Sequence, residues 1–218
     1  MSRTKKPTVT AHTGAMQTKE NSLDSMRAGF ANADIVEFDV RFNSDKVPVL
    51  SHGWPVPKDA VPLEDAFRLL AQYPDKQANV DLKSTDNLPA VQALAEQYGV
   101  LKQIFFTGVF SSFVPAVQKG APKIPYYLNC DINPLLKHSA AYARRLAKRV
   151  EESGAIGINC SFRNATPRIV AALHERGLPV SLWTVSNEDQ LQKVLHLGPD
   201  NVTTRIPDRV NAALLQSE

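Results

Sequence analysis

Hydrophobic and polar positions along the chain follow two periods that alternate from one end to the other. Short runs rich in β-branched and aromatic residues, such as residues 35–40, are typical of strands. Segments with apolar residues three and four positions apart, such as residues 63–72, are typical of helices that bury one face. Gly99 and Gly177 follow two of the helical segments, as glycine often does just after a helix end.

The pattern predicts a regular succession of elements. The predicted strands are residues 7–11, 35–40, 47–51, 78–83, 103–107, 125–129, 155–159, 178–184 and 201–204. The predicted helices are residues 19–31, 63–72, 88–98, 110–119, 133–153, 167–176, 187–197 and 207–215. With residues 47–51 set aside as an extra hairpin arm, eight strand-then-helix units remain.

Eight such units are what a (β/α)₈ TIM barrel requires, although alternating strands and helices also fit a doubly wound sheet. The units are near-equal in length and lack a glycine-rich dinucleotide-binding turn, which favours the barrel. No low-complexity linker divides the chain, so we expect a single domain over residues 1–218.

Composition is ordinary for a globular protein. Hydrophobic residues make up 43% and charged residues 22% of the 218 residues, and the net charge is only +3. Arg3, Lys5 and Lys6 are interpreted as a solvated terminus, so we expect no nucleic-acid partner. We expect no transmembrane segment and no secretion signal, because no long apolar run exists and no apolar stretch follows the basic tip. A cytoplasmic location is the default, and the oligomeric state stays open.

The other titratable residues that attract attention are cysteines and histidines away from strand ends. Cys130 and Cys160 match no metal-ligand spacing, and we expect both to be inert buried thiols. His138, His174 and His196 fall in helical patterns, and we expect them at the surface.

Two carboxylates stand out within the strand pattern. Glu37 and Asp39 are two residues apart, which places them on the same side of a strand. If buried, they would repel one another unless a cation lay between them, and a hard divalent ion with oxygen ligands is the obvious candidate. The alternative is an edge strand with a solvated polar face.

The ends of the predicted strands favour the metal site. In such barrels the chemistry takes place at the C-terminal ends of the strands. The polar residues at those ends are His12, Glu37, Asp39, Asp81, Lys83, Thr107, Asn129, Asn159, Thr184 and Thr204. His12, the carboxylates and Lys83 come from the first three units, and this clustering predicts a functional site.

Several short motifs follow one another along the chain. They are His12-Thr13-Gly14, Glu20-Asn21-Ser22, Glu37-Phe38-Asp39-Val40, Asp45 to His52, Pro62-Leu63-Glu64-Asp65-Ala66, Asn79-Val80-Asp81-Leu82-Lys83, Leu182-Trp183-Thr184-Val185 and Thr204 to Asp208. Their order and spacing resemble the glycerophosphodiester phosphodiesterase family, within the phospholipase-C-like phosphodiesterase barrels. The resemblance extends over nearly the whole chain, without the insertion that some relatives carry.

The resemblance implies metal-dependent hydrolysis of a glycerophosphodiester to glycerol phosphate and an alcohol. It implies that His12 and His52 are the general acid/base pair, which their near-neutral reference pKa suits. We expect Glu37, Asp39 and Asp81 to hold one Mg²⁺ or Ca²⁺. Lys83 lies two residues beyond Asp81 on the same strand face, where its charge could contact the phosphate.

Departures from the family pattern affect the substrate more than the fold. Thr13 replaces an arginine that contacts the phosphate, and Gly53 replaces an aspartate. Asp81 is one methylene shorter than the usual glutamate. Arg205 replaces an aspartate, and it either supplies the missing guanidinium or is a solvated residue before the last helix. We expect Thr13, Lys83, Trp183 and Arg205 to bind substrate, although Trp183 also fits a core role.

Three functions therefore stay open. The first is hydrolysis of a glycerophosphodiester, in which the nucleophile is either water or the substrate's neighbouring hydroxyl. The second is cleavage of a lysophospholipid or another phosphodiester, which the altered positions 13 and 53 motivate. The third is a binding barrel without catalysis, although such a barrel has no need of two histidines and three acids.

Overall fold

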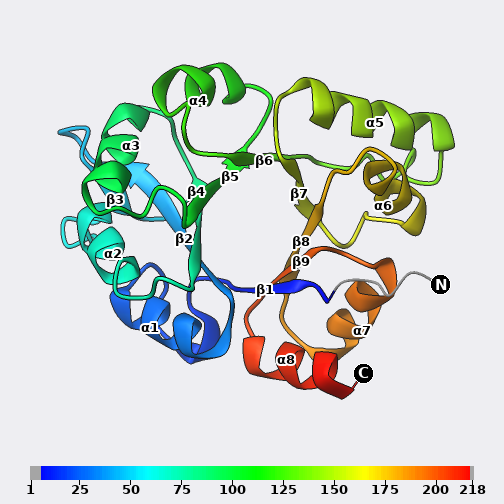
Figure 1. Ribbon diagram of the computed structural model, residues 1–218, viewed down its shortest axis with the longest axis horizontal. Helices are drawn as coiled ribbons and strands as arrows, with labels where there is room; N and C mark the ends of the chain where they lie inside the picture. The colour runs from blue at the N-terminus through cyan, green and yellow to red at the C-terminus, as the bar shows by residue number, and fades with distance from the viewer. Residues whose placement is uncertain (1–5, 217–218) are drawn as a thin grey trace.

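Eight of the predicted strands pair in parallel and close into a barrel, as the computed structural model shows for residues 6–216 (Figure 1). The strands are β1 (Thr8–Ala11), β2 (Ile35–Phe42), β4 (Gln77–Leu82), β5 (Ile104–Val109), β6 (Tyr126–Asn129), β7 (Gly157–Ser161), β8 (Val180–Val185) and β9 (Asn201–Thr204). Their order around the barrel is β1, β2, β4, β5, β6, β7, β8, β9, and the β1–β9 pairing joins its ends. The chain is thus a (β/α)₈ TIM barrel.

Strand β3 (Pro48–Leu50) pairs antiparallel with the end of β2, as expected for the hairpin arm. Helices surround the barrel as an outer ring (Figure 1). They are α1 (Leu23–Asn32), α2 (Leu63–Leu70), α3 (Leu88–Gln97), α4 (Val114–Gly120), α5 (Ala140–Glu152), α6 (Pro167–His174), α7 (Glu188–Leu197) and α8 (Pro207–Gln216), with a short 3₁₀ turn η1 at Ala15–Gln17. Each helix of the ring follows a barrel strand in the order that the hydrophobic pattern predicts, except that the arm β3 lies between β2 and α2.

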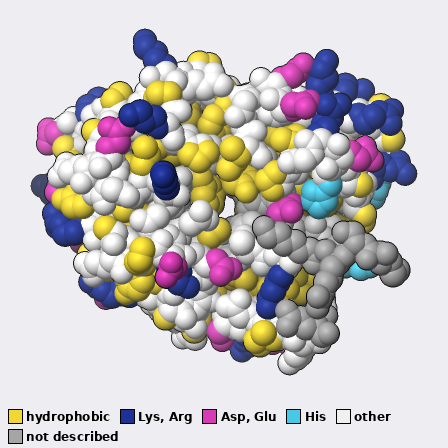
Figure 2. Space-filling view, in the orientation of Figure 1, with side chains coloured by type: hydrophobic (Ala, Val, Ile, Leu, Met, Phe, Trp, Pro, Cys, Tyr) yellow, Lys and Arg dark blue, Asp and Glu magenta, His cyan; other side chains and the backbone are white. Residues whose placement is uncertain are grey.

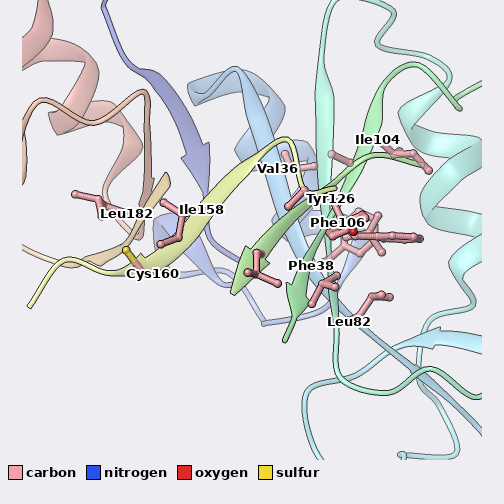
Figure 3. Packing of buried hydrophobic residues seen from close by; sticks show 14 of the residues in the cluster. Val36, Phe38, Leu82, Ile104, Phe106, Tyr126, Ile158, Cys160 and Leu182 are labelled. Atoms are coloured by element: carbon pink, nitrogen blue, oxygen red, sulfur yellow. The ribbon is translucent and has the colours of Figure 1, made fainter. Parts of the chain in front are cut away.

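The main hydrophobic core lies between the strands and this ring of helices. Phe38, Phe106 and Leu182 are among its fully buried members, and Figure 3 shows such side chains projecting from neighbouring strands. Because side chains alternate along a strand, the residues between them face the barrel interior. Those positions carry polar residues, including Glu37, Asp39, Thr107, Asn129 and Asn159, all of them buried. The barrel interior is therefore polar and its outside apolar.

Three predicted helices begin later in the structure, and a side-chain cap marks the start of two of them. The predicted helix 133–153 is wrong over residues 133–139, which form a turn after Pro134. Helix α5 begins only after Ser139, whose Oγ accepts a hydrogen bond from the Tyr142 N–H. Ser22 caps α1 in the same way, and α4 starts at Val114. His138 consequently lies in the turn rather than in a helix.

The structure confirms the predicted burial of the cysteines and the predicted exposure of three histidines. Cys130 and Cys160 are buried, and burial raises the pKa of both thiols. His138, His174 and His196 are exposed. Arg3 and Lys5 lie outside the described residues. Charges of both signs are spread over the face in Figure 2. Within residues 6–216, no helix is long and apolar enough to cross a membrane.

Candidate active site

The C-terminal ends of the barrel strands surround a cavity of about 500 Å³. Its walls include eight of the nine predicted site residues, namely His12, Glu37, Asp39, His52, Asp81, Lys83, Trp183 and Arg205. They come from loops and strands at opposite ends of the sequence, and closure of the barrel brings them together. Only Thr13 is not among the residues that line the cavity.

Three carboxylates meet on one side of this cavity. Glu37 and Asp39 lie on β2, and Asp81 lies beside Asp39 on the paired strand β4. One oxygen from each carboxylate lies within 4.8 Å of the other two. Glu37 is only 6% exposed and Asp39 only 3% exposed, which excludes the solvated edge strand. Burial, and then the neighbouring charges of Asp39 and Asp81, raise the pKa of Glu37 well above that of an ordinary carboxyl.

Lys83 partly balances this cluster. Its Nζ lies 2.9 Å from Asp39 Oδ1 and also donates to Asp81. Burial by itself would lower the pKa of Lys83, but Asp81 and Asp39 outweigh it and raise the pKa. Three carboxylates and one ammonium leave a net charge of −2 when all are ionised. This charge and an all-oxygen donor set fit one hard divalent cation.

Each carboxylate is held by a donor from another part of the chain. The Thr13 N–H donates to Glu37 Oε2 at 2.9 Å, and Asn21 Nδ2 donates to Asp39 Oδ2 at 2.9 Å. Thr107 Oγ1 donates to Asp81 Oδ1 at 2.5 Å. Such supporting hydrogen bonds fix the direction in which a ligand oxygen points.

Two of these supporting residues, Asn21 and Thr107, had no predicted role. Asn21 belongs to a motif of the family resemblance, and its backbone N–H binds Thr13 Oγ1 at 2.6 Å. Thr107 was visible as a polar residue at a strand end. Thr13 itself is 1% exposed, and its side chain contacts the protein rather than the cavity. The structure therefore gives Thr13 a supporting position behind Glu37.

The two predicted catalytic histidines differ in their surroundings. His12 Nδ1 lies 2.6 Å from the carbonyl oxygen of Thr13. Because a carbonyl only accepts, Nδ1 carries the proton and Nε2 is left as the proton acceptor. Burial lowers the pKa of His12, which favours the neutral ring. His52 is exposed, and its backbone carbonyl is held by Arg41 Nε at 2.9 Å.

Comparison with protein-family models decides the family. The model of the glycerophosphoryl diester phosphodiesterase family matches residues 11–61 and 55–209. The chain belongs to this family. Its members are phosphoric diester hydrolases. A comparison with curated protein sequences gave no match.

Solved structures agree with the fold of this family. A glycerophosphodiester phosphodiesterase from Parabacteroides distasonis has a TM-score of 0.80 and 17% identity, over 97% of this chain and 98% of the other. A phosphodiesterase from Oleispira antarctica, solved with the product sn-glycerol-3-phosphate, has a TM-score of 0.80 and 19% identity, over 95% and 96% of the chains. At these identities the likeness establishes the fold alone.

Arg205 is the main departure from the family pattern that reaches the cavity. Its Nη2 donates to Glu20 Oε1 at 2.8 Å, and both residues line the cavity. The backbone of Gly14, with φ of 76°, lies so close to Glu20 that a Cβ at position 14 would be 2.6 Å from Glu20 Cγ. A guanidinium is therefore present in the same cavity as His12, although it comes from the residue after β9 rather than from position 13.

Proposed function

We propose that the protein hydrolyses a glycerophosphodiester to glycerol phosphate and an alcohol, using one Mg²⁺ or Ca²⁺ held by Glu37, Asp39 and Asp81. Membership of the glycerophosphoryl diester phosphodiesterase family supports the reaction. The observation that carries the proposal is the cluster of three carboxylates in one cavity with two histidines and Lys83. The glycerol-3-phosphate bound to the Oleispira antarctica protein supports the expected product.

The residues present can perform each part of this reaction. A bound divalent cation would neutralise phosphate charge and polarise the phosphorus centre. Lys83 and Arg205 add positive charge for the phosphate oxygens. His12 is neutral and its Nε2 carries no proton, so Nε2 accepts the proton of the attacking oxygen. His52 donates a proton to the oxygen that leaves phosphorus. The attacking oxygen belongs to water or to the substrate's neighbouring hydroxyl.

The test is an activity screen with a matched set of histidine variants. The substrates are glycerophosphocholine, glycerophosphoethanolamine and glycerophosphoinositol, each with Mg²⁺, Ca²⁺ or chelator. We expect His12→Ala and His52→Ala each to lower activity by about 10²- to 10⁴-fold, the usual contribution of a general acid or base. His196→Ala changes an exposed histidine on α7 and serves as the control. Undiminished activity in His12→Ala or His52→Ala contradicts the mechanism.

A lysophospholipid is the second candidate substrate, because an apolar residue stands at the edge of the cavity. Phe110 lines the cavity and is 43% exposed, so it could contact an acyl chain. Activity on lysophosphatidylcholine above that on glycerophosphocholine would favour this candidate. The single domain over residues 1–218, the cytoplasmic location and the absence of a nucleic-acid partner stay predictions.

A further inference from the structure

The cavity has two sides that differ in charge. Counting around the barrel, β7 lies four strands from β2 in either direction, and β8 lies four strands from β4. Asn159 on β7 and Trp183 on β8, which both line the cavity, therefore lie across the barrel from the three carboxylates. We call His12, Glu37, Asp39, Asp81, Lys83 and Arg205 the charged half. We call Asn129, Asn159 and Trp183 the neutral half.

Two polar atoms of the neutral half are buried without a partner among residues 6–216. They are Asn159 Oδ1 and Trp183 Nε1, and both residues line the cavity. Asn159 is 4% exposed. The great majority of buried polar atoms in native proteins are hydrogen-bonded, so two unpaired ones on residues that line a single cavity point to a ligand.

The hydrogen bonds of Asn129 settle which atom of Asn159 is open. Asn129 Oδ1 accepts from the Gly108 N–H at 2.9 Å, and a backbone N–H can only donate. The same oxygen lies 3.2 Å from Asn159 Nδ2. Since an acceptor requires a donor opposite it, Asn159 must turn its amide nitrogen to Asn129 and leave its oxygen open. The open pair is therefore one acceptor and one donor.

We propose that Asn159 Oδ1 and Trp183 Nε1 bind the terminal hydroxyl of the substrate's glycerol and determine specificity for it, an inference that rests on the proposed function. A hydroxyl can donate one hydrogen and accept another, so its chemistry matches one unpaired acceptor and one unpaired donor. The subsite lies across the barrel from Asp39, Asp81 and Lys83, and the glycerol carbon farthest from phosphorus would extend toward it. An acyl ester at that carbon has no hydrogen to donate to Asn159, so the subsite disfavours a lysophospholipid.

The test compares two substrates that differ by this one hydroxyl. They are glycerophosphocholine and its deoxy analogue, which keeps the middle hydroxyl but has hydrogen in place of the terminal one. Sites that bind a substrate hydroxyl with buried polar groups discriminate strongly against analogues without it. We expect the wild-type kcat/KM for the analogue to be lower by about 100-fold.

Two variants and one control separate recognition from packing. Trp183→Phe removes the indole N–H and keeps an aromatic ring, and Asn159→Leu removes the acceptor at similar size. We expect each variant to lower kcat/KM for glycerophosphocholine about tenfold and to leave kcat/KM for the deoxy analogue nearly unchanged. Trp54→Phe is the matched control, because Trp54 is 70% exposed and is not among the cavity-lining residues.

The results that overturn the inference are distinct. Equal loss on both substrates means that Trp183 only packs, and no loss on either means that the two atoms have no substrate partner. A loss that varies with headgroup instead would place the leaving alcohol there. If the wild type hydrolyses none of these diesters, the proposed function fails. Calorimetric binding of glycerol 3-phosphate against propane-1,2-diol 1-phosphate then still tests the subsite, since equal affinities contradict it.

Discussion

In the charged half of the cavity, each of three carboxylates accepts a hydrogen bond from a fixed neighbour, whereas the neutral half contains two buried polar atoms without a partner in residues 6–216. Both halves are built from the same alternation of side chains at strand ends. The difference lies in what completes each half. The charged half has an excess of negative charge that suits a cation, and the neutral half has an unpaired acceptor and donor that suit a hydroxyl.

This contrast separates binding of the reacting phosphate from recognition of the rest of the substrate. A buried carboxylate cluster tolerates little movement, because each oxygen must face either a cation or a donor. The unpaired atoms of the neutral half carry no net charge, so they need no counterion in the absence of substrate. We therefore expect changes in the charged half to affect all substrates equally, and changes in the neutral half to affect the choice between substrates.

Removal of divalent cations should have the largest effect. We expect a chelator to lower hydrolysis of glycerophosphocholine and of its deoxy analogue by the same factor, about a thousandfold or more, because the cation stabilises charge on the phosphate that both share. Added Mg²⁺ or Ca²⁺ should restore both activities. Release of choline measures both activities. If this release persists in chelator, the charged half works without a cation.

Thr107→Val should weaken the charged half without touching a ligand. The change removes the hydroxyl that donates to Asp81, and loss of such a supporting bond typically costs about 10- to 100-fold in metal affinity. The cation concentration that gives half-maximal activity measures this. Thr18→Val, outside the cavity, is the control. An unchanged metal requirement would mean that Asp81 is not a ligand.

Arg205→Gln should raise KM by about tenfold for every phosphodiester, because a charged guanidinium contact to phosphate is lost. Arg205→Lys should recover only part of the loss. Initial-rate kinetics on glycerophosphocholine and the deoxy analogue measure both. If Arg205→Gln has the same KM as the wild type, Arg205 does not contact the phosphate and interacts only with Glu20 and solvent.

The smallest effect concerns pH and follows from Glu37. Because the pKa of Glu37 is raised in the folded chain, protonation of Glu37 stabilises the cation-free fold. This stabilisation is complete below the ordinary carboxyl pKa and is lost as pH rises through the raised pKa of the folded state. A bound cation takes the place of that proton. We therefore expect the gain in Tm on adding cation to be larger at pH 8 than at pH 5.

The size of this gain follows from mass action. Cation at a hundred times its Kd stabilises the fold by about 2.7 kcal/mol, which is about 5–10 °C for a chain of this size. Differential scanning calorimetry at the two pH values measures it. Glu37→Gln should reduce the pH dependence, and an equal gain at both pH values in the wild type would contradict the assignment of Glu37.

The hydrophobic pattern was sufficient for the barrel, because buried parallel strands and amphipathic helices leave strong periodic signals. Strand ends and short motifs then identified the carboxylates and histidines. The pattern could not locate helix starts such as that of α5, since Ser139 acts as a cap only through its bond to Tyr142.

The neutral half shows what the sequence could not supply. Asn159 appeared only as one polar strand end among several. Its open oxygen follows from a hydrogen bond to Asn129, thirty positions away, and from the Gly108 N–H beyond it. The supporting position of Thr13 likewise depends on Asn21 and Glu37, which only the folded chain brings next to it.

The most direct test of this division is calorimetric titration of Mg²⁺ and Ca²⁺ into the wild type, Asp39→Asn and Trp183→Phe. We expect one ion to bind to the wild type and to Trp183→Phe with the same affinity, and none to bind to Asp39→Asn. Absence of binding to the wild type, or equal weakening in both variants, would contradict the account.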